Sequence, residues 1–149
     1  MAVKARPEGY HSITPYLVVE GAARLIEFLI QAFGAEEVHR MPAPGGLVGH
    51  AEVRIGDSVV MLGDARGEHH ATNTMLYLYV EDVDATYQIA LAAGAEAVQP
   101  PMDQFYGDRS GSVKDPCGNV WYIATHIEDV APDELKRRAQ KAMQGAGGS

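Results

Sequence analysis

The sequence has little that would cross-link the chain, anchor it in a membrane or attract it to nucleic acid. A single cysteine, Cys117, excludes an intramolecular disulfide. No apolar run approaches the roughly 20 residues of a membrane span, and residues 1–7 lack the apolar stretch of a secretory signal. Lys and Arg number 12 against 20 Asp and Glu, and the formal net charge of −8 disfavours binding to nucleic-acid phosphates. We therefore expect a cytoplasmic protein with no nucleic-acid partner and no membrane partner.

The composition is that of a folded domain. The chain has 149 residues, of which 46% are hydrophobic and 21% are charged, and this balance argues against disorder. The length suits a single domain with a sizeable core. The 16 glycines and 8 prolines predict many short elements separated by turns.

The most informative feature is an internal repeat. Residues 16–20 (YLVVE) reappear as residues 77–81 (YLYVE), and residues 32–38 (AFGAEEV) reappear as residues 92–98 (AAGAEAV). Two copies of roughly 60 residues are too few and too long for a solenoid. Chance similarity between alanine-rich helices is the alternative, but the order of strand, helix and Gly-Ala-Glu is repeated as well. We therefore expect two copies of one supersecondary unit.

The first copy predicts the order β-α-β-β-β. β-Branched residues open it as a strand, and apolar residues at helical spacing follow until Gly34, which suits the left-handed end of a helix. The predicted elements are a strand at 13–19, a helix at 21–33, and strands at 35–41, 47–55 and 59–62.

The second copy repeats this order. Asp82 is a suitable N-cap, and Pro100 and Pro101 are expected to stop the strand that precedes them. The predicted elements are strands at 74–80, 95–99, 104–114 and 120–125, with a helix at 83–93. Beyond the repeat we expect a helix at 132–143, entered through Pro132, and a frayed tail at 145–149.

Several short segments, together with the repeated order of elements, point to a known family. These segments are residues 14–17, 49–52, 56–58, 106–111, 115–121 and 124–126. They resemble the vicinal oxygen chelate superfamily, which includes glyoxalase I, extradiol dioxygenases, fosfomycin-resistance enzymes and bleomycin-binding proteins. Within it the chain looks most like the PhnB-like branch of glyoxalase/bleomycin-resistance proteins.

The resemblance implies an α+β fold in which two tandem βαβββ modules form a curled eight-stranded mixed sheet around a cavity, with the helices outside. It implies one glyoxalase/bleomycin-resistance-like domain, and because members commonly dimerise it also implies a homodimer. The boundaries that we expect are 10–130 for the domain, 10–64 for the first module, 65–73 for a polar linker, 74–126 for the second module and 131–149 for the C-terminal helix and tail.

Many members of this superfamily hold one divalent metal through up to four side chains, usually His or Glu. The corresponding positions here are Thr14, Met61, Met75 and Tyr122. None is an imidazole, carboxylate or thiolate, which are the ligands that such ions require. We therefore predict no metal at this position and no cofactor.

His50 and Glu52 are the candidate catalytic residues. They lie two apart on one predicted strand and so share a face, where they would form a general acid–base pair. The alternative is a structural pair joined by a hydrogen bond, or a solvated pair that faces outward.

Aromatic residues dominate the candidate substrate-binding set. Tyr16, Tyr77 and Tyr79 share the alternation of the cavity positions, whereas Trp121 has the opposite parity and is expected in the core under the helices. Arg109 offers a rigid fork of donors to an anion, although an Asp108–Arg109 ion pair that shapes the strand is equally consistent. The full set is Tyr16, Tyr77, Tyr79, Phe105, Tyr106, Arg109 and Tyr122.

Two functions remain open, and the sequence does not decide whether the protein is an enzyme. One is a small-molecule-binding protein of the bleomycin-resistance type, without the usual metal, for an aromatic or cationic ligand. The acidic charge and the tyrosines favour it. The other is a glyoxalase-like lyase or isomerase that uses His50 and Glu52. A structural subunit without a ligand is a third, weaker reading.

Overall fold

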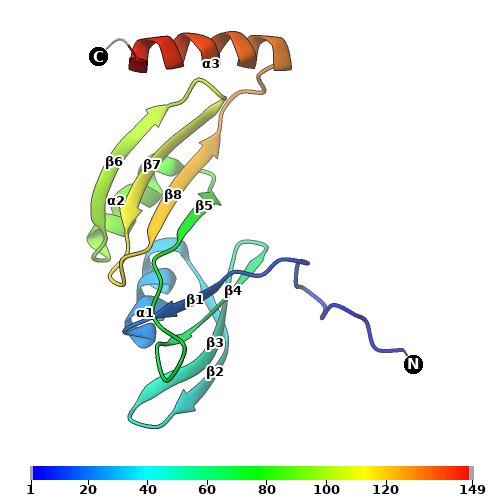
Figure 1. Ribbon diagram of the computed structural model, residues 1–149, viewed down its shortest axis with the longest axis vertical. Helices are drawn as coiled ribbons and strands as arrows, with labels where there is room; N and C mark the ends of the chain where they lie inside the picture. Colours follow the sequence, from blue (N-terminus) through cyan, green and yellow to red (C-terminus); the bar gives the residue numbers. More distant parts are fainter. Residues whose placement is uncertain (1, 148–149) are drawn as a thin grey trace.

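The computed structural model describes residues 2–147, which form eight strands and three helices (Figure 1). In chain order the elements are β1 (Tyr16–Val19), α1 (Ala22–Phe33), β2 (Glu36–Ala43), β3 (Leu47–Ile55), β4 (Ser58–Asp64), β5 (Met75–Tyr79), α2 (Val83–Ala92), β6 (Glu96–Asp103), β7 (Asp108–Lys114), β8 (Val120–His126) and α3 (Pro132–Gly147). The α+β class and the two βαβββ units are thus confirmed.

The strands divide into two four-stranded mixed sheets rather than one continuous sheet of eight. Their orders are β1-β4-β3-β2 and β5-β8-β7-β6. In each sheet the first strand of the module lies parallel to the last, and the two remaining pairs are antiparallel. Neither sheet closes on itself, so each keeps one face toward the helices and one open face.

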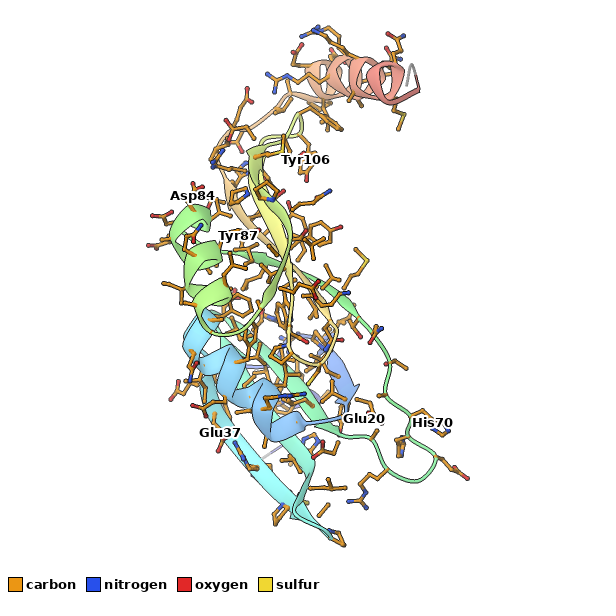
Figure 2. The ribbon with its side chains drawn as sticks, turned by 90° about the vertical axis from the view of Figure 1, so that its left-hand side faces the viewer. Glu20, Glu37, His70, Asp84, Tyr87 and Tyr106 are labelled. Atoms are coloured by element: carbon orange, nitrogen blue, oxygen red, sulfur yellow. The ribbon has the colours of Figure 1, made fainter. Side chains whose placement is uncertain are left out.

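The helices α1 and α2 cover the same side of both sheets. Figure 2 shows α1 and α2 following one another along one side of the molecule. The helix α1 buries Leu25, Ile26 and Leu29 completely. Trp121 is 2% exposed, and its ring centroid lies 5.0 Å from that of Phe33, so it lies in the core, as its parity predicts.

Local signals set the helix ends. Gly34 ends α1 with φ 67, a left-handed conformation that glycine adopts without steric cost. Asp82 caps α2 by accepting a hydrogen bond from the Ala85 N–H at 3.1 Å. The α1 start has no such local cap. Instead, Asp64 on β4 accepts hydrogen bonds from the Gly21 and Ala22 N–H groups, each at 2.9 Å.

Three expected strand boundaries are wrong. One is the start of β7, which begins at Asp108 rather than at residue 104, because residues 105 and 106 form a turn. The first strand begins at Tyr16, not at residue 13, and Ile13 is 86% exposed. Pro100 and Pro101 do not stop β6, which continues to Asp103. Proline is tolerated there because β6 is an edge strand and its pairing with β7 shifts register between Gln99 and Met102.

Two segments lie outside the modules, and they differ in how they contact the sheets. The connection between β4 and β5 is held to β1, because the Ala65 N–H donates to Val19 O at 2.7 Å and the Thr72 N–H to Val18 O at 3.1 Å. The helix α3 projects beyond the second sheet (Figure 1) and extends to Gly147, past the expected end at 143. The last two residues of the expected tail, 148–149, lie outside the described residues. In the described part of the chain no helix is both long and apolar enough to span a membrane.

Candidate functional site

The faces of the two sheets that the helices leave open carry most of the candidate residues. Side chains alternate along a strand, so Leu17 points to the helices and is fully buried, whereas Tyr16 beside it is 47% exposed. By the same alternation Tyr77 and Tyr79 on β5 are 44% and 60% exposed. Each module therefore offers its own open face, and each face holds a hydrogen-bonded network.

The network on the first module centres on His50. Its Nε2 lies 2.8 Å from Glu52 Oε2, and its Nδ1 lies 3.1 Å from the Tyr16 hydroxyl. The Tyr10 hydroxyl donates a further hydrogen bond to Glu52. These bonds, from Tyr10 first and His50 second, lower the pKa of Glu52. The structure thus brings His50, Glu52 and Tyr16 together, and adds Tyr10, which no local sequence signal marks.

The network on the second module centres on Asp108. Its carboxylate is 3% exposed and accepts hydrogen bonds from the Tyr77 hydroxyl at 2.7 Å and the Tyr79 hydroxyl at 2.8 Å. It also lies 2.8 Å from His126 Nδ1. Burial acts to raise the pKa of Asp108, but the hydrogen bonds from His126, Tyr77 and Tyr79 outweigh it and the pKa is lowered. Asp108 therefore stays ionised and fixes two tyrosines.

His126 completes this network on the solvent side. Its Nε2 lies 2.7 Å from the exposed carboxylate of Asp129. The pKa of His126 is raised, first by the hydrogen bond to Asp108 and then by the one to Asp129. The imidazole is thus favoured in its cationic form between two carboxylates. Sequence spacing alone does not bring His126 to Asp108, because Asp108 lies 18 residues away at the start of β7.

The aromatic rings of the second module form what we call the aromatic platform, consisting of Tyr77, Tyr79 and Tyr122. Tyr77 stacks on Tyr122 with centroids 5.9 Å apart and planes at 11°, and Tyr79 lies 5.3 Å from Tyr77. The pKa of Tyr77 is raised by burial and then by hydrogen bonding to Tyr106 and Asp108. Tyr106 therefore borders the platform, at the end of the sheet nearest α3 (Figure 2).

Two of the predicted substrate-binding residues, Phe105 and Arg109, do not belong to the aromatic platform. Phe105 packs edge-on against Tyr106, with centroids 5.3 Å apart, and is 39% exposed in the loop after β6. Arg109 lies on the helix side of β7, where its guanidinium binds Asp84 at 2.9 and 3.0 Å and Asp103 at 3.0 Å. Asp108 is not its partner. Asp84 and Asp103 bind the Arg109 guanidinium from both sides, so the side chain does not join the tyrosines on the open face.

Cys117 has no catalytic setting. Its thiol lies 3.4 Å from the Glu20 carbonyl oxygen, and burial raises its pKa. A nucleophilic cysteine requires a lowered pKa. Its role is consistent with packing in the turn before β8.

The donor set at the family's metal position does not fit a divalent metal. The four positions are Thr14, Met61 on β4, Met75 on β5 and Tyr122 on β8, so they carry a hydroxyl, two thioethers and a phenol. Within residues 2–147 no group of three or more His, Cys, Asp or Glu side chains is arranged to hold a metal ion. We therefore derive no chemistry through a metal.

Comparison with known proteins identifies the family. The model of the Glyoxalase/Bleomycin resistance protein/Dioxygenase superfamily matches residues 9–123. The chain therefore belongs to this superfamily. It is 39% identical over 158 residues to a protein of Mycobacterium bovis described as uncharacterised, a match that covers 99% of this chain and all of the relative.

Solved structures agree on the fold. TioX from Micromonospora sp. ML1 is 29% identical, with a TM-score of 0.66 over 78% of this chain and 99% of that chain. A PhnB protein from Bacillus cereus, described as a putative 3-demethylubiquinone-9 3-methyltransferase, is 20% identical with a TM-score of 0.63. That match covers 77% of this chain and 99% of the other, and it shows the fold alone.

Proposed function

We propose that this protein is a small-molecule-binding protein of the glyoxalase/bleomycin-resistance type that binds its ligand without the family's usual metal. One observation carries the proposal: the aromatic platform exposes ring surface while Asp108 holds two of its hydroxyls. Rings held in place before binding lose little conformational entropy when a ligand arrives. Exposed, ordered ring faces are suited to stacking on a planar aromatic molecule.

The charge around the platform favours a cationic ligand. Asp108 binds two of its hydroxyls, Asp129 is joined to Asp108 through His126, and the whole chain has a formal net charge of −8. Tyrosine faces also attract cations through the ring quadrupole. A planar aromatic cation would both stack on the tyrosine rings and be attracted by the negative charge around them.

The first test is therefore a titration with proflavine, a planar aromatic cation, followed by its fluorescence. Tyr79→Ala removes an exposed ring and should weaken binding by about tenfold, because stacking and cation–π contacts contribute roughly 1–3 kcal/mol per ring. Tyr79→Phe keeps the ring and loses only the hydroxyl bond to Asp108, so it should weaken binding less than Tyr79→Ala does. Unchanged affinity in Tyr79→Ala would refute the platform as the binding surface.

A lyase or isomerase is the second candidate, and the 2.8 Å contact between His50 and Glu52 supports it. Glu52 is a weak choice for the acid, since its pKa is lowered. In this reading His50 is the base and Glu52 orients it. His50→Ala separates the two functions: a binding protein keeps its proflavine affinity, whereas an enzyme loses about 10²–10⁴-fold in turnover.

We also propose that the protein forms a homodimer in which a second copy covers part of the open faces. The support is the exposure of large apolar side chains there, with Met75 at 65% and Met102 at 57%. Contiguous exposed apolar surface is typical of interaction sites. Sedimentation equilibrium should give twice the chain mass at micromolar concentration, and a monomer mass would contradict the proposal.

A further inference from the structure

A hollow lies on the first module, away from the aromatic platform. It is a groove of about 800 Å³ between the open face of the first sheet and the connection from β4 to β5. We call it the connection groove. Figure 2 shows this connection, marked by His70, on the side of the molecule opposite α1 and α2. Ligand pockets for small molecules are typically about 300–1,000 Å³, so the groove is large enough for a small organic molecule.

One wall of the connection groove is apolar. It is formed by the end of β2 and by β1, and its apolar members are Val18, Met41, Pro42, Ala43 and Pro44. Met41 is 53% exposed, so a ligand that lies on this wall removes apolar surface from water. Tyr16 on β1 also lines the groove, but no second tyrosine joins it, so this wall differs from the stacked rings of the aromatic platform.

The opposite wall is basic and is held in place by the backbone. Arg66 and His69 form an antiparallel bridge with two hydrogen bonds of 3.0 Å, so their side chains share a face, and both line the groove. Gly67, at φ +59, supplies the tight turn between them. His50 lines the groove from β3.

The guanidinium of Arg66 has no acidic partner in the described part of the chain. None of the side-chain hydrogen bonds or ion pairs between residues 2 and 147 includes Arg66, whereas Arg109 and Arg138 each bind two carboxylates. The one carboxylate that lines the groove, Asp64, already accepts three backbone N–H groups, including that of Val48 at 2.7 Å. In a chain of net charge −8, this leaves an unopposed cation over the groove.

Small residues allow the guanidinium to lie close to the sheet. A Cβ at Gly49 would stand 3.4 Å from Arg66 Nη1 and 3.3 Å from the Ala43 Cβ. The missing side chain thus leaves room for Arg66 above β3, next to the apolar wall. An apolar surface and a free guanidinium fork therefore meet in one hollow.

We propose that the connection groove binds an amphipathic organic anion, with its apolar body on the Met41 wall and its carboxylate, sulfonate or phosphate head on Arg66 and His69. The guanidinium fork is suited to such heads because it donates two parallel hydrogen bonds. This site goes beyond the proposed function: it lies on the other module and takes a ligand of opposite charge.

The test uses two fluorescent probes of similar shape and different charge, 8-anilinonaphthalene-1-sulfonate and uncharged N-phenyl-1-naphthylamine. Arg66→Gln should weaken binding of the sulfonate by roughly tenfold, the effect of losing a charged hydrogen bond, and change binding of the neutral probe by less than about twofold. Arg66→Lys should lie between. The matched control is Arg40→Gln, which removes the same charge from the same sheet at a residue already paired with Glu37.

Octanoate separates this groove from the aromatic platform, because it has a carboxylate head and no ring. It should displace the sulfonate probe from the unchanged protein and from Tyr79→Ala alike, whereas 1-octanol should not. The proposal is overturned if the sulfonate does not bind saturably, if Arg66→Gln binds it normally, if Arg40→Gln weakens it equally, or if octanoate fails to displace it. Proflavine binding reports on the proposed function independently.

Discussion

The buried carboxylate of Asp108 offers the sharpest test of the second network. Replacing it with asparagine keeps the shape but leaves a single acceptor oxygen for three donors, which lie at 2.7, 2.8 and 2.8 Å. If that oxygen faces the tyrosines, the amide NH₂ faces His126 Nδ1, which accepts only when the imidazole is neutral. The charged hydrogen bond to His126 is lost, and the bonds from the Tyr77 and Tyr79 hydroxyls then go to a neutral amide oxygen. Asp108→Asn should therefore lower the free energy of unfolding by about 2–3 kcal/mol.

Asp129→Asn is the matched control. Asp129 contacts the same histidine at 2.7 Å, but its side chain is fully exposed. Exposed ion pairs contribute little to stability, so this variant should unfold at the same urea concentration as the unchanged protein. Urea unfolding, with unchanged slopes, measures both variants. Equal losses in the two variants would refute the reasoning, because burial would then not distinguish the carboxylates.

The pH dependence follows from the directions of the two pKa shifts. His126 has a raised pKa in the folded protein, so its contribution is present below about 6.5, the unfolded value, and is lost as the pH rises through the folded pKa. Asp108 has a lowered pKa, so its contribution is present above about 3.9 and is lost as the pH falls. Asp108→Asn should therefore cost most between about pH 4 and 6.5. Nuclear magnetic resonance should also show the pKa of His126 falling in Asp108→Asn, and an unchanged value would contradict the network.

Three further predictions concern stability. Asp64→Ala leaves three backbone N–H groups without an acceptor and should lower the free energy of unfolding by about 3–5 kcal/mol in urea titrations. Because the pKa of Asp64 is lowered in the folded protein, this loss should shrink as the pH falls below about 4. A loss under about 1 kcal/mol at pH 7 would be inconsistent with the capping role of Asp64. Gly63→Ala places a Cβ 2.8 Å from Gly49 O and should cost about 1–3 kcal/mol, whereas Gly145→Ala, which meets no atom within 4 Å, should be silent in the same titration. Ending the chain after residue 131 should leave the melting temperature nearly unchanged, because α3 projects from the body, and a fall of more than about 5 °C would show that it stabilises the core.

Much of the fold was predictable because its signals are local. The apolar spacing of α1, the glycine at its end and the aspartate that caps α2 each act within a few residues, and all three predictions are confirmed. The repeat correctly predicted two units of the same order. The prediction that two prolines end β6 is wrong because proline is tolerated in an edge strand. Only the strand order shows that β6 lies at an edge.

The candidate sites were only partly predictable. His50 and Glu52 were expected on one face, and their contact at 2.8 Å follows from strand alternation. Neither Tyr10 beside Glu52 nor Asp108 beneath the tyrosines was expected. The partners lie 42 residues apart in the first case and 29 or 31 in the second, too far for any periodicity to connect them.

The sequence by itself determined the family and the two βαβββ units, because these depend on residue type and spacing along the chain. Only the tertiary structure decided which charges are free. It joined Arg109 to Asp84 and Asp103, placed His126 between Asp108 and Asp129, and left Arg66 beside the connection groove without an acidic partner among residues 2–147. Ion pairing depends on distances of about 3 Å between groups that the chain brings together from distant segments. Composition and spacing carry no record of such distances.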